Sequence, residues 1–263
     1  LEVWKEKNVS IKKPLGENEM LSLMKKPEFK KKQNLLKSLT CVKDLPSNHP
    51  AVKFVEFRKI PKKHWNILFF TEDFGKYSKL LDPVGSECGK EERLIIPMFN
   101  KHGDVVAAQG RLITMHGEVN ARTTLRYITV KADKSIDRLW YGMWRADPKK
   151  KVYVVEGPLD SLFISNTIAM VGSGAMEKIH SRFENSDITY ILDNEPRNYQ
   201  IAKYNERLIG IGKNVCIWPN EIREKDINDM IYTRSSNEIK TIIDKNTYSG
   251  AEAILRLRDW KKV

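Results

Sequence analysis

Cysteine is scarce in this chain of 263 residues. The three cysteines, Cys41, Cys88 and Cys216, lie far apart and leave an odd number for pairing. They therefore indicate no disulfide framework and no Cys-x-x-Cys zinc site, which fits a reducing compartment. The five histidines show no ligand spacing either. A structural zinc site and a histidine-based nucleophile system thus have no support in the sequence.

Long hydrophobic runs are also missing. The longest apolar stretches have about five or six residues, whereas a membrane-spanning helix needs roughly 20. No secretory leader opens the chain, so we expect neither export nor a membrane partner. The first residue is Leu1 rather than Met, which favours an excised piece of a longer protein. With 41% hydrophobic and 30% charged residues, the chain has the composition of a folded protein with one large or two modest domains.

Positive charge is present in excess, and it is unevenly distributed. The formal net charge is +12. Residues 1–40 hold 10 basic and 5 acidic residues, residues 41–150 hold 20 and 13, and residues 151–263 hold 16 and 16. The whole excess therefore lies in the first 150 residues. This pattern predicts a polyanion-binding surface beside a metal-dependent centre, and the alternative is a lysine-rich solubilising surface.

The basic part of the chain divides into two segments. Residues 1–37 are polar and rich in lysine, which predicts a basic linker or tether. Residues 38–150 read as a basic subdomain of mixed α+β structure. Its expected helices and strands are helices at 50–56 and 61–65 and strands at 93–99, 105–111 and 126–130.

Residues 151–234 alternate between short apolar strands and helices, which predicts an α/β subdomain with a largely parallel sheet. The expected strands are 152–155, 168–171, 188–192 and 215–218, and the expected helices are 158–166, 196–209 and one beginning near Ile227. Residues 235–263 would form a helical C-terminal end. The predicted fold class is therefore α/β, with the α+β subdomain first.

Acidic residues follow three of these strands. Glu156 and Asp160 follow the first, Asp193 and Glu195 the third, and a loop after the fourth carries Asp226-Ile227-Asn228-Asp229. The carboxyl ends of parallel strands meet at one edge, so we expect these carboxylates to converge there. Oxygen ligands of this kind suit Mg²⁺ or Mn²⁺, at two or more ions. The alternative for each acid is an ordinary helix cap or first-turn charge.

These segments resemble the Toprim domain, and more fully the DNA primases of T-even-like bacteriophages, within the bacterial-type primase family. The resemblance covers residues 38 to 235. Its motifs are Glu156-Gly157-Pro158-Leu159-Asp160, Leu192-Asp193-Asn194-Glu195, Lys225-Asp226-Ile227-Asn228-Asp229, Arg93-Leu94-Ile95-Ile96-Pro97, Gln109-Gly110-Arg111, Arg126-Tyr127-Ile128 and Leu139-Trp140-Tyr141-Gly142. Glu195 departs from the family's usual Asp and Arg126 from its usual Lys.

The resemblance implies a DNA-directed RNA polymerase that makes short RNA primers. It implies Asp193, Glu195, Asp226 and Asp229 as metal ligands, Glu156 as general base or further ligand, and Asp160 as the group that orients Glu156 or a nearby basic residue. Template and triphosphate phosphates would be bound by Arg93, Arg111, Arg126, Lys131 and Lys134.

The resemblance also implies partners: single-stranded DNA, ribonucleoside triphosphates, the nascent RNA primer and a hexameric replicative helicase. It places the protein in the cytoplasm of an infected bacterial host. Members of the family carry a zinc-binding domain before this core, and without Cys-x-x-Cys pairs we expect that domain to be absent from this sequence. Three alternatives are a Toprim nuclease, a topoisomerase and a non-catalytic module that binds single-stranded DNA.

Overall fold

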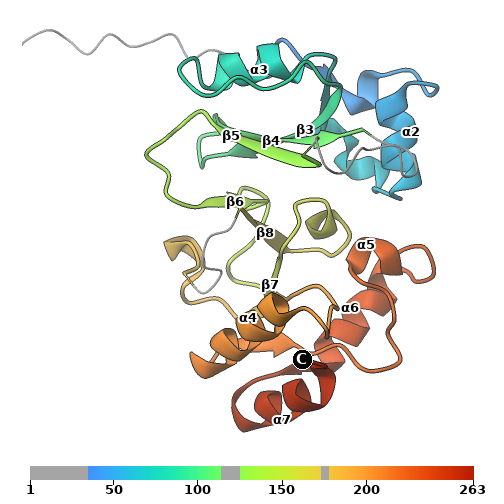
Figure 1. The fold of residues 1–263 in the computed structure, drawn as a ribbon, viewed down its shortest axis with the longest axis vertical. Helices are drawn as coiled ribbons and strands as arrows, with labels where there is room; N and C mark the ends of the chain where they lie inside the picture. Colours follow the sequence, from blue (N-terminus) through green and yellow to red (C-terminus); the bar gives the residue numbers. More distant parts are fainter. Residues whose placement is uncertain (1–34, 114–124, 173–177) are drawn as a thin grey trace, which may run out of the picture. The chain divides into compact units, whose positions relative to one another are not determined.

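The computed structural model describes residues 35–113, 125–172 and 178–263, so most of the predicted linker (1–37) lies outside it. The described chain forms two β-sheets, one of five strands and one of six (Figure 1). The first sheet comes from the basic part of the chain, and the four central strands of the second come from the alternating part. Together they confirm the predicted fold class.

The first sheet has the strand order β1-β2-β3-β4-β5, and all its neighbours are antiparallel. Its strands are β1 (Thr40–Cys41), β2 (Phe69–Thr71), β3 (Arg93–Phe99), β4 (Val105–Leu112) and β5 (Tyr127–Lys131). A turn around Gly103, whose φ is 80°, joins β3 to β4. Glycine takes this left-handed conformation without a steric cost, so the predicted turn forms here.

The two faces of the first sheet are covered differently, because successive residues of a strand point to opposite faces. Ile95 and Ala108 pack with Phe74 of α3 (Phe74–Leu81) in a small core on one face. Leu94 and Ile96 point to the other face, where they join a larger core that continues into the second sheet. Helix α2 (Pro50–Phe57) contributes its buried apolar residues to this larger core. The central strands are therefore covered on both faces, whereas β5 at the edge stays partly exposed.

The second sheet has the order β11-β10-β9-β7-β8-β6. Its four central strands are parallel to their neighbours, and β6 and β11 pair antiparallel at the edges. The strands are β6 (Leu139–Tyr141), β7 (Val152–Val155), β8 (Thr167–Val171), β9 (Ile188–Ile191), β10 (Asn214–Cys216) and β11 (Thr247–Tyr248). The largely parallel sheet was predicted, and its central strands are buried as that topology requires.

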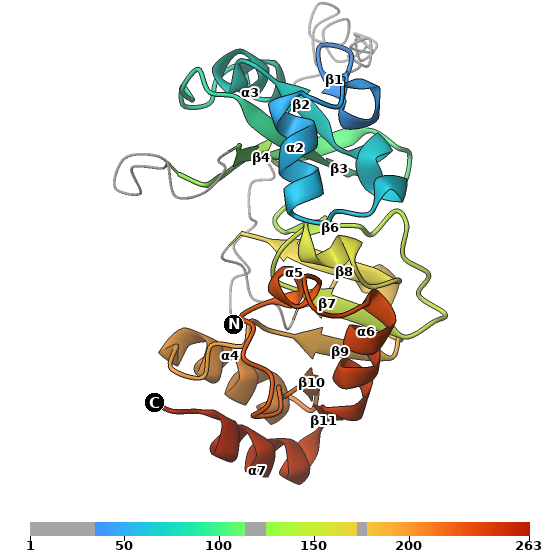
Figure 2. The ribbon, with the colours of Figure 1, turned by 90° about the vertical axis from the view of Figure 1, so that its right-hand side faces the viewer.

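Four helices accompany the second sheet, and Figure 2 shows β9 and β10 between two of them, α4 and α6. Their bounds are α4 (Tyr199–Gly210), α5 (Ile227–Met230), α6 (Ser236–Lys245) and α7 (Gly250–Trp260). Helix α6 begins with a capping box, in which the side chains of Ser235 and Glu238 bond to each other's backbone N–H. Helices α4 and α7 pack together.

The structure differs from the sequence-based expectation between β7 and β8. Residues 158–166 form no α-helix and contain one 3₁₀ turn, Asp160–Leu162. Ser161 is buried here, and its Oγ donates to Pro158 O at 2.6 Å. Asn166 ends the segment with a φ of 58°, and its side chain donates to two loop carbonyls. These side-chain hydrogen bonds to backbone carbonyls take the place of the hydrogen bonds of a helix.

The large core joins the parts that bear the two sheets. Phe99 of β3 packs edge-on against Trp144, with 4.9 Å between ring centroids. Near α5, Asn228 Nδ2 donates to Arg58 O at 2.7 Å, at the end of α2. The second sheet draws β6 and β11 from outside residues 151–234, and the boundaries 38–150, 151–234 and 235–263 stay predictions. Among the described residues, no helix is long and apolar enough to cross a membrane.

Candidate active site

The acidic residues after β7 and β9 lie side by side at one edge of the second sheet. These strands are parallel neighbours, with Val155 opposite Ile191, so both chains leave the sheet at the same level. Glu156 Oε1 accepts a hydrogen bond from Asp193 N at 3.0 Å. A small cavity at this edge is lined by four carboxylates, Glu156, Asp160, Asp193 and Asp226, which we call the acid rim. Three of the predicted acidic segments therefore converge, as expected.

Backbone hydrogen bonds hold the other two carboxylates of the acid rim. Asp160 Oδ1 accepts from Asn228 N at 3.1 Å, which links the loop after β7 to α5. Asp226 caps α5, because its Oδ1 accepts from Asp229 N at 2.7 Å. Gly157 leaves room beside them: a Cβ there would lie 2.4 Å from Asp160 Oδ2, so a larger residue would displace this carboxylate.

Glu195 and Asp229 lie next to the acid rim without lining its cavity. Lys225 Nζ lies 3.3 Å from Glu195 Oε1 and 3.6 Å from Asp193 Oδ2, so one ammonium group partly neutralises two predicted ligands. Asp229 is exposed, and burial and the charge of Asp226 raise its pKa. Both residues are electrostatically coupled to the acid rim, Glu195 to Glu156 and Asp229 to Asp226.

The acid rim is electrostatically strained. Burial, followed by the charges of Glu156, Asp160 and Asp226, raises the pKa of Asp193 to about 8. Burial, followed by the charge of Asp226, raises the pKa of Asp160 to about 7, whereas Arg58 opposes this shift. Burial also raises the pKa of Glu156. Carboxylates that repel one another in this way are stabilised by a bound cation.

Helix capping explains only part of this arrangement. Helix α4 begins at Tyr199 rather than at the expected Pro196, and Asn198 is its cap. Asp193 and Glu195 are therefore not caps of α4. Asp226 does cap the N-terminus of α5, so its carboxylate has two roles: it caps a helix and it belongs to the acid rim.

The donor chemistry of the acid rim suits a hard divalent cation, because all the candidate ligands are carboxylate oxygens. Within residues 35–113, 125–172 and 178–263, however, no three His, Cys, Asp or Glu side chains form a ready-made metal site. Lys225 and the Asp193–Glu156 backbone contact hold the carboxylates in another arrangement. The ligand atoms are of the type that a divalent metal ion prefers, but the side chains must rotate to bring their oxygens together.

Arg111 lies on the face of the first sheet that points toward the large core. It pairs with Tyr127 across β4 and β5, and its guanidinium lies 4.8 Å from that ring and 5.6 Å from the ring of Phe54. Its Nε and Nη1 are buried and have no hydrogen-bond partner among the described residues. Tyr127 is electrostatically coupled to the acid rim: burial raises its pKa, and Asp160 and Asp226 add to the rise. Arg111 is thus a cation with unused donors near the acid rim.

Arg93 lies on the opposite face and is fully buried. Its guanidinium donates to Glu91 Oε2 at 2.5 and 2.8 Å, to Gly110 O at 2.9 Å and to Leu125 O at 2.9 Å. It also lies 5.2 Å from the ring of Phe74 in α3. The structure therefore places Arg93 as a cross-link within the first sheet, away from any surface where it could meet a phosphate.

The other three predicted phosphate-binding residues belong to β5 and the segments beside it. Arg126 is exposed just before β5. Lys131 Nζ donates to Ile136 O at 2.7 Å and Asp137 O at 3.0 Å. Lys134 Nζ pairs with Asp82 at 2.8 Å, and 60% of its side chain is exposed. Of this set, Arg126 and Lys134 are exposed, and Lys134 is already paired with Asp82.

Two basic residues near the acid rim were missed in the sequence. Arg58 follows α2, and its charge lowers the pKa of Asp160, Asp229 and Tyr127. Lys225 was quoted only as part of a motif, although it is the cation that contacts the predicted ligands. The position of Lys225, directly before the predicted ligand Asp226, was the signal in the sequence that could have identified it. Arg58 carried no such signal, because only the docking of α2 on α5 brings it there.

Comparisons with known proteins identify clear relatives, although no family model matches the chain. The DNA primase of Enterobacteria phage T4 is 31% identical over 272 residues, which covers 100% of this chain and 76% of that protein. Among solved structures, the Escherichia coli primase catalytic core has a TM-score of 0.60 at 13% identity, covering 81% of this chain and 78% of that one.

A second solved structure, the zinc-binding and RNA polymerase domains of the Aquifex aeolicus primase, has a TM-score of 0.56 at 18% identity. The match covers 76% of this chain and 57% of that one. This chain therefore spans little more than half of that structure. At these identities the two solved structures show a shared fold.

Proposed function

This chain belongs to the DNA primase family, and on that premise we propose that it is the nucleotidyl-transferring core of a primase. It joins ribonucleoside triphosphates on a single-stranded DNA template and so makes a short RNA primer. The observation that supports this proposal is the convergence of four carboxylates beside a basic and aromatic face of the first sheet. Phosphoryl transfer on nucleic acid requires both parts, because acids hold the cation and basic groups hold the polyanion.

Asp193, Glu195 and Asp226 would hold divalent cations, with Glu156 and Asp229 as further ligands. When bound there, Mg²⁺ or Mn²⁺ would neutralise the triphosphate and lower the pKa of the primer 3′-hydroxyl. Lys225 contacts two of these carboxylates and would compete with a cation for them. Its release would place an ammonium group beside the incoming phosphates.

Glu156 is the candidate proton acceptor, because burial raises its pKa toward the range in which a carboxylate exchanges protons. Its Oε1 is oriented by Asp193 N. Asp160 positions α5 through Asn228 N and so indirectly positions Asp226. The phosphates of template or triphosphate would meet Arg111 and Arg126.

The proposal includes partners, some of which follow from the reaction and some from the family resemblance. Single-stranded DNA, ribonucleoside triphosphates and the nascent primer follow from the reaction itself. A hexameric helicase and the cytoplasm of an infected bacterium follow from the family resemblance. No described element is assigned to the helicase contact.

The test is incorporation of labelled ribonucleotides on single-stranded DNA that carries an annealed primer, with and without Mg²⁺ or Mn²⁺. The primer makes the assay independent of the ability to start a chain. We expect extension that requires the metal and that Asp193→Asn abolishes. Asp137→Asn is the matched control, because the Asp137 side chain is 92% exposed and pairs only with its neighbour Arg138.

Metal-dependent cutting of the DNA in place of extension would assign the chain to the nuclease alternative. DNA binding without either reaction would favour the binding module. Extension by Asp193→Asn at the wild-type rate would show that the acid rim is not the catalytic centre.

A further inference from the structure

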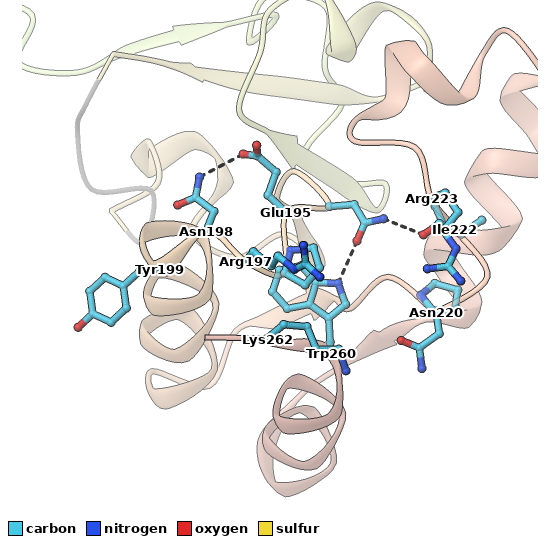
Figure 3. Close-up of a pocket in the computed structure, with 12 residues that line it drawn as sticks. Glu195, Arg197, Asn198, Tyr199, Asn220, Ile222, Arg223, Trp260 and Lys262 are labelled. Carbon is cyan, nitrogen blue, oxygen red and sulfur yellow. Dashed lines mark hydrogen bonds between the residues drawn. The ribbon is translucent and has the colours of Figure 1, made fainter.

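A second cavity adjoins the acid rim, and it lies on the side where α4 begins. It has a volume of about 840 Å³ and is bordered by the loop before α4, the loop after β10 and the end of α7 (Figure 3). Its lining residues are Asn194, Glu195, Pro196, Arg197, Asn198, Tyr199, Pro219, Asn220, Ile222, Arg223, Trp260 and Lys262. Figure 3 shows Tyr199 turned away from the other labelled side chains. The volume falls within the range of small-molecule sites.

The charge of this cavity is mainly positive. Arg197, Arg223 and Lys262 line it, against one carboxylate, Glu195. Within the described part of the chain, neither arginine side chain forms an ion pair or a hydrogen bond. Glu195 itself is already engaged by Lys225 and by Asn198 Nδ2. Two guanidinium groups without protein acceptors, facing one cavity, favour an anionic ligand.

The walls of the cavity are tied to the loop that carries the predicted metal ligands. Asn194 stands between Asp193 and Glu195, and its Nδ2 donates to Ile222 O at 3.0 Å and to Glu224 O at 3.1 Å. Trp260 Nε1 donates to Asn194 Oδ1 at 2.9 Å. One half-buried amide therefore fixes three wall segments relative to the acid rim. A ligand in the cavity would be held at a defined distance from the catalytic carboxylates.

We propose that this cavity is a triphosphate subsite, in which Arg197 and Arg223 bind the phosphates of a ribonucleotide whose other end lies at the acid rim. This inference rests on the proposed function. Glu195 lines the cavity and is itself a predicted metal ligand, so a chain of several phosphates suits a ligand that extends from the arginines to the acid rim. Two sources have this chemistry: the incoming ribonucleoside triphosphate and the 5′-triphosphate end of a primer.

The experiment compares Arg197→Gln/Arg223→Gln with the wild-type chain in primer extension. Both arginines are exposed, so their substitution leaves the core intact. Arg258→Gln is the control, because Arg258 is an exposed arginine of α7 that lies outside the cavity. If the incoming nucleotide is the ligand, we expect KM for ribonucleoside triphosphates to be about tenfold higher in the double variant, because binding of the nucleotide is about tenfold weaker. Its kcat would stay within about twofold, and Arg258→Gln would behave as wild type.

If the primer end is the ligand, KM for the free triphosphate stays unchanged. The double variant then loses the preference for a 5′-triphosphate primer over a 5′-hydroxyl primer. Calorimetric titration with tripolyphosphate gives a readout that needs no catalysis: the wild-type chain binds it and the double variant binds it about tenfold more weakly.

The proposal is overturned if the double variant matches wild type in KM, primer preference and tripolyphosphate affinity, or if Arg258→Gln has the same effect. If the wild-type chain does not extend primers but binds tripolyphosphate through Arg197 and Arg223, the anion site stands and the primase assignment fails. If Asp193→Asn abolishes extension while the double variant has no effect, the primase assignment stands and the subsite fails.

Discussion

The substitution Asp193→Asn should stabilise the folded chain at alkaline pH while it abolishes primer extension. The pKa of Asp193 rises from 3.8 to about 8 because the group is buried and faces three other carboxylates. An acid with a raised pKa binds its proton more tightly in the folded state. Its contribution to stability is therefore complete below pH 3.8 and is lost as the pH rises through about 8.

The magnitude follows from the pKa change, at about 1.4 kcal/mol for each pKa unit. The full change would exceed about 5 kcal/mol, but Asp193 shares the repulsion with Glu156, Asp160 and Asp226. The Asp193 side chain is also 26% exposed, and Lys225 lies 3.6 Å away. Removal of this one charge should therefore recover about 1 to 3 kcal/mol of unfolding free energy at pH 8.5.

The assay is urea denaturation of both proteins at pH 5, 7 and 8.5 in the presence of EDTA. We expect the advantage of Asp193→Asn to be largest at pH 8.5 and smallest at pH 5. Millimolar Mg²⁺ should stabilise the wild-type chain more than the variant, because a ligand stabilises only the state that binds it. The exposed control Asp137→Asn should show neither effect. If Asp193→Asn is no more stable than wild type at pH 8.5, the carboxylates of the acid rim do not repel one another as described.

Three further substitutions separate structural from nucleic-acid-binding roles in the first sheet. Arg93→Ala removes a buried cation and leaves Glu91 and several carbonyls unpaired, so urea denaturation should show a loss of about 3 to 5 kcal/mol. Gly110→Ala would place a Cβ 2.5 Å from the ring of Phe74, and the expected loss by the same measurement is about 1 to 3 kcal/mol. Arg126→Ala should leave stability within about 0.5 kcal/mol of wild type, because Arg126 is exposed. In titrations of single-stranded DNA at several salt concentrations, the same variant should bind more weakly with a shallower salt slope; unchanged binding and slope would remove Arg126 from the DNA-binding face.

Much of the fold could be predicted from the sequence, because its strands are marked locally. Turn residues and acids flank the apolar runs of β3, β4, β7 and β9. The bounds of these four strands lie within a residue or two of the expected ones. The prediction of a helix at 158–166 was wrong. Helical propensity is a weak preference, and here the hydrogen bond of the buried Ser161 and the positive φ of Asn166 outweigh it.

The site was partly predictable for a similar reason. Parallel strands deliver their carboxyl-end residues to one edge, so Glu156 and Asp193 could be placed together from order alone. The basic residues follow no such rule. Arg93 and Arg111 lie in adjacent strands, but the pairing register puts them on opposite faces, and α3 covers one of these faces. Only the tertiary structure shows that Arg93 is buried and that Arg58 lies near the acids.

Neutral hydrogen bonds fix the backbone around the repelling carboxylates, beside the ion pairs that Lys225 makes with Asp193 and Glu195. Backbone on both sides of Asp193 is fixed: Trp218 Nε1 donates to Leu192 O at 2.8 Å, and the side chain of Asn194 makes three bonds. One of these bonds comes from Trp260 at the end of α7. Such bonds do not weaken when a cation enters, whereas an ion pair in their place would compete with it for the carboxylates. The C-terminal helix is therefore part of the support of the acid rim, and the acids can remain strained and available because their backbone cannot move apart.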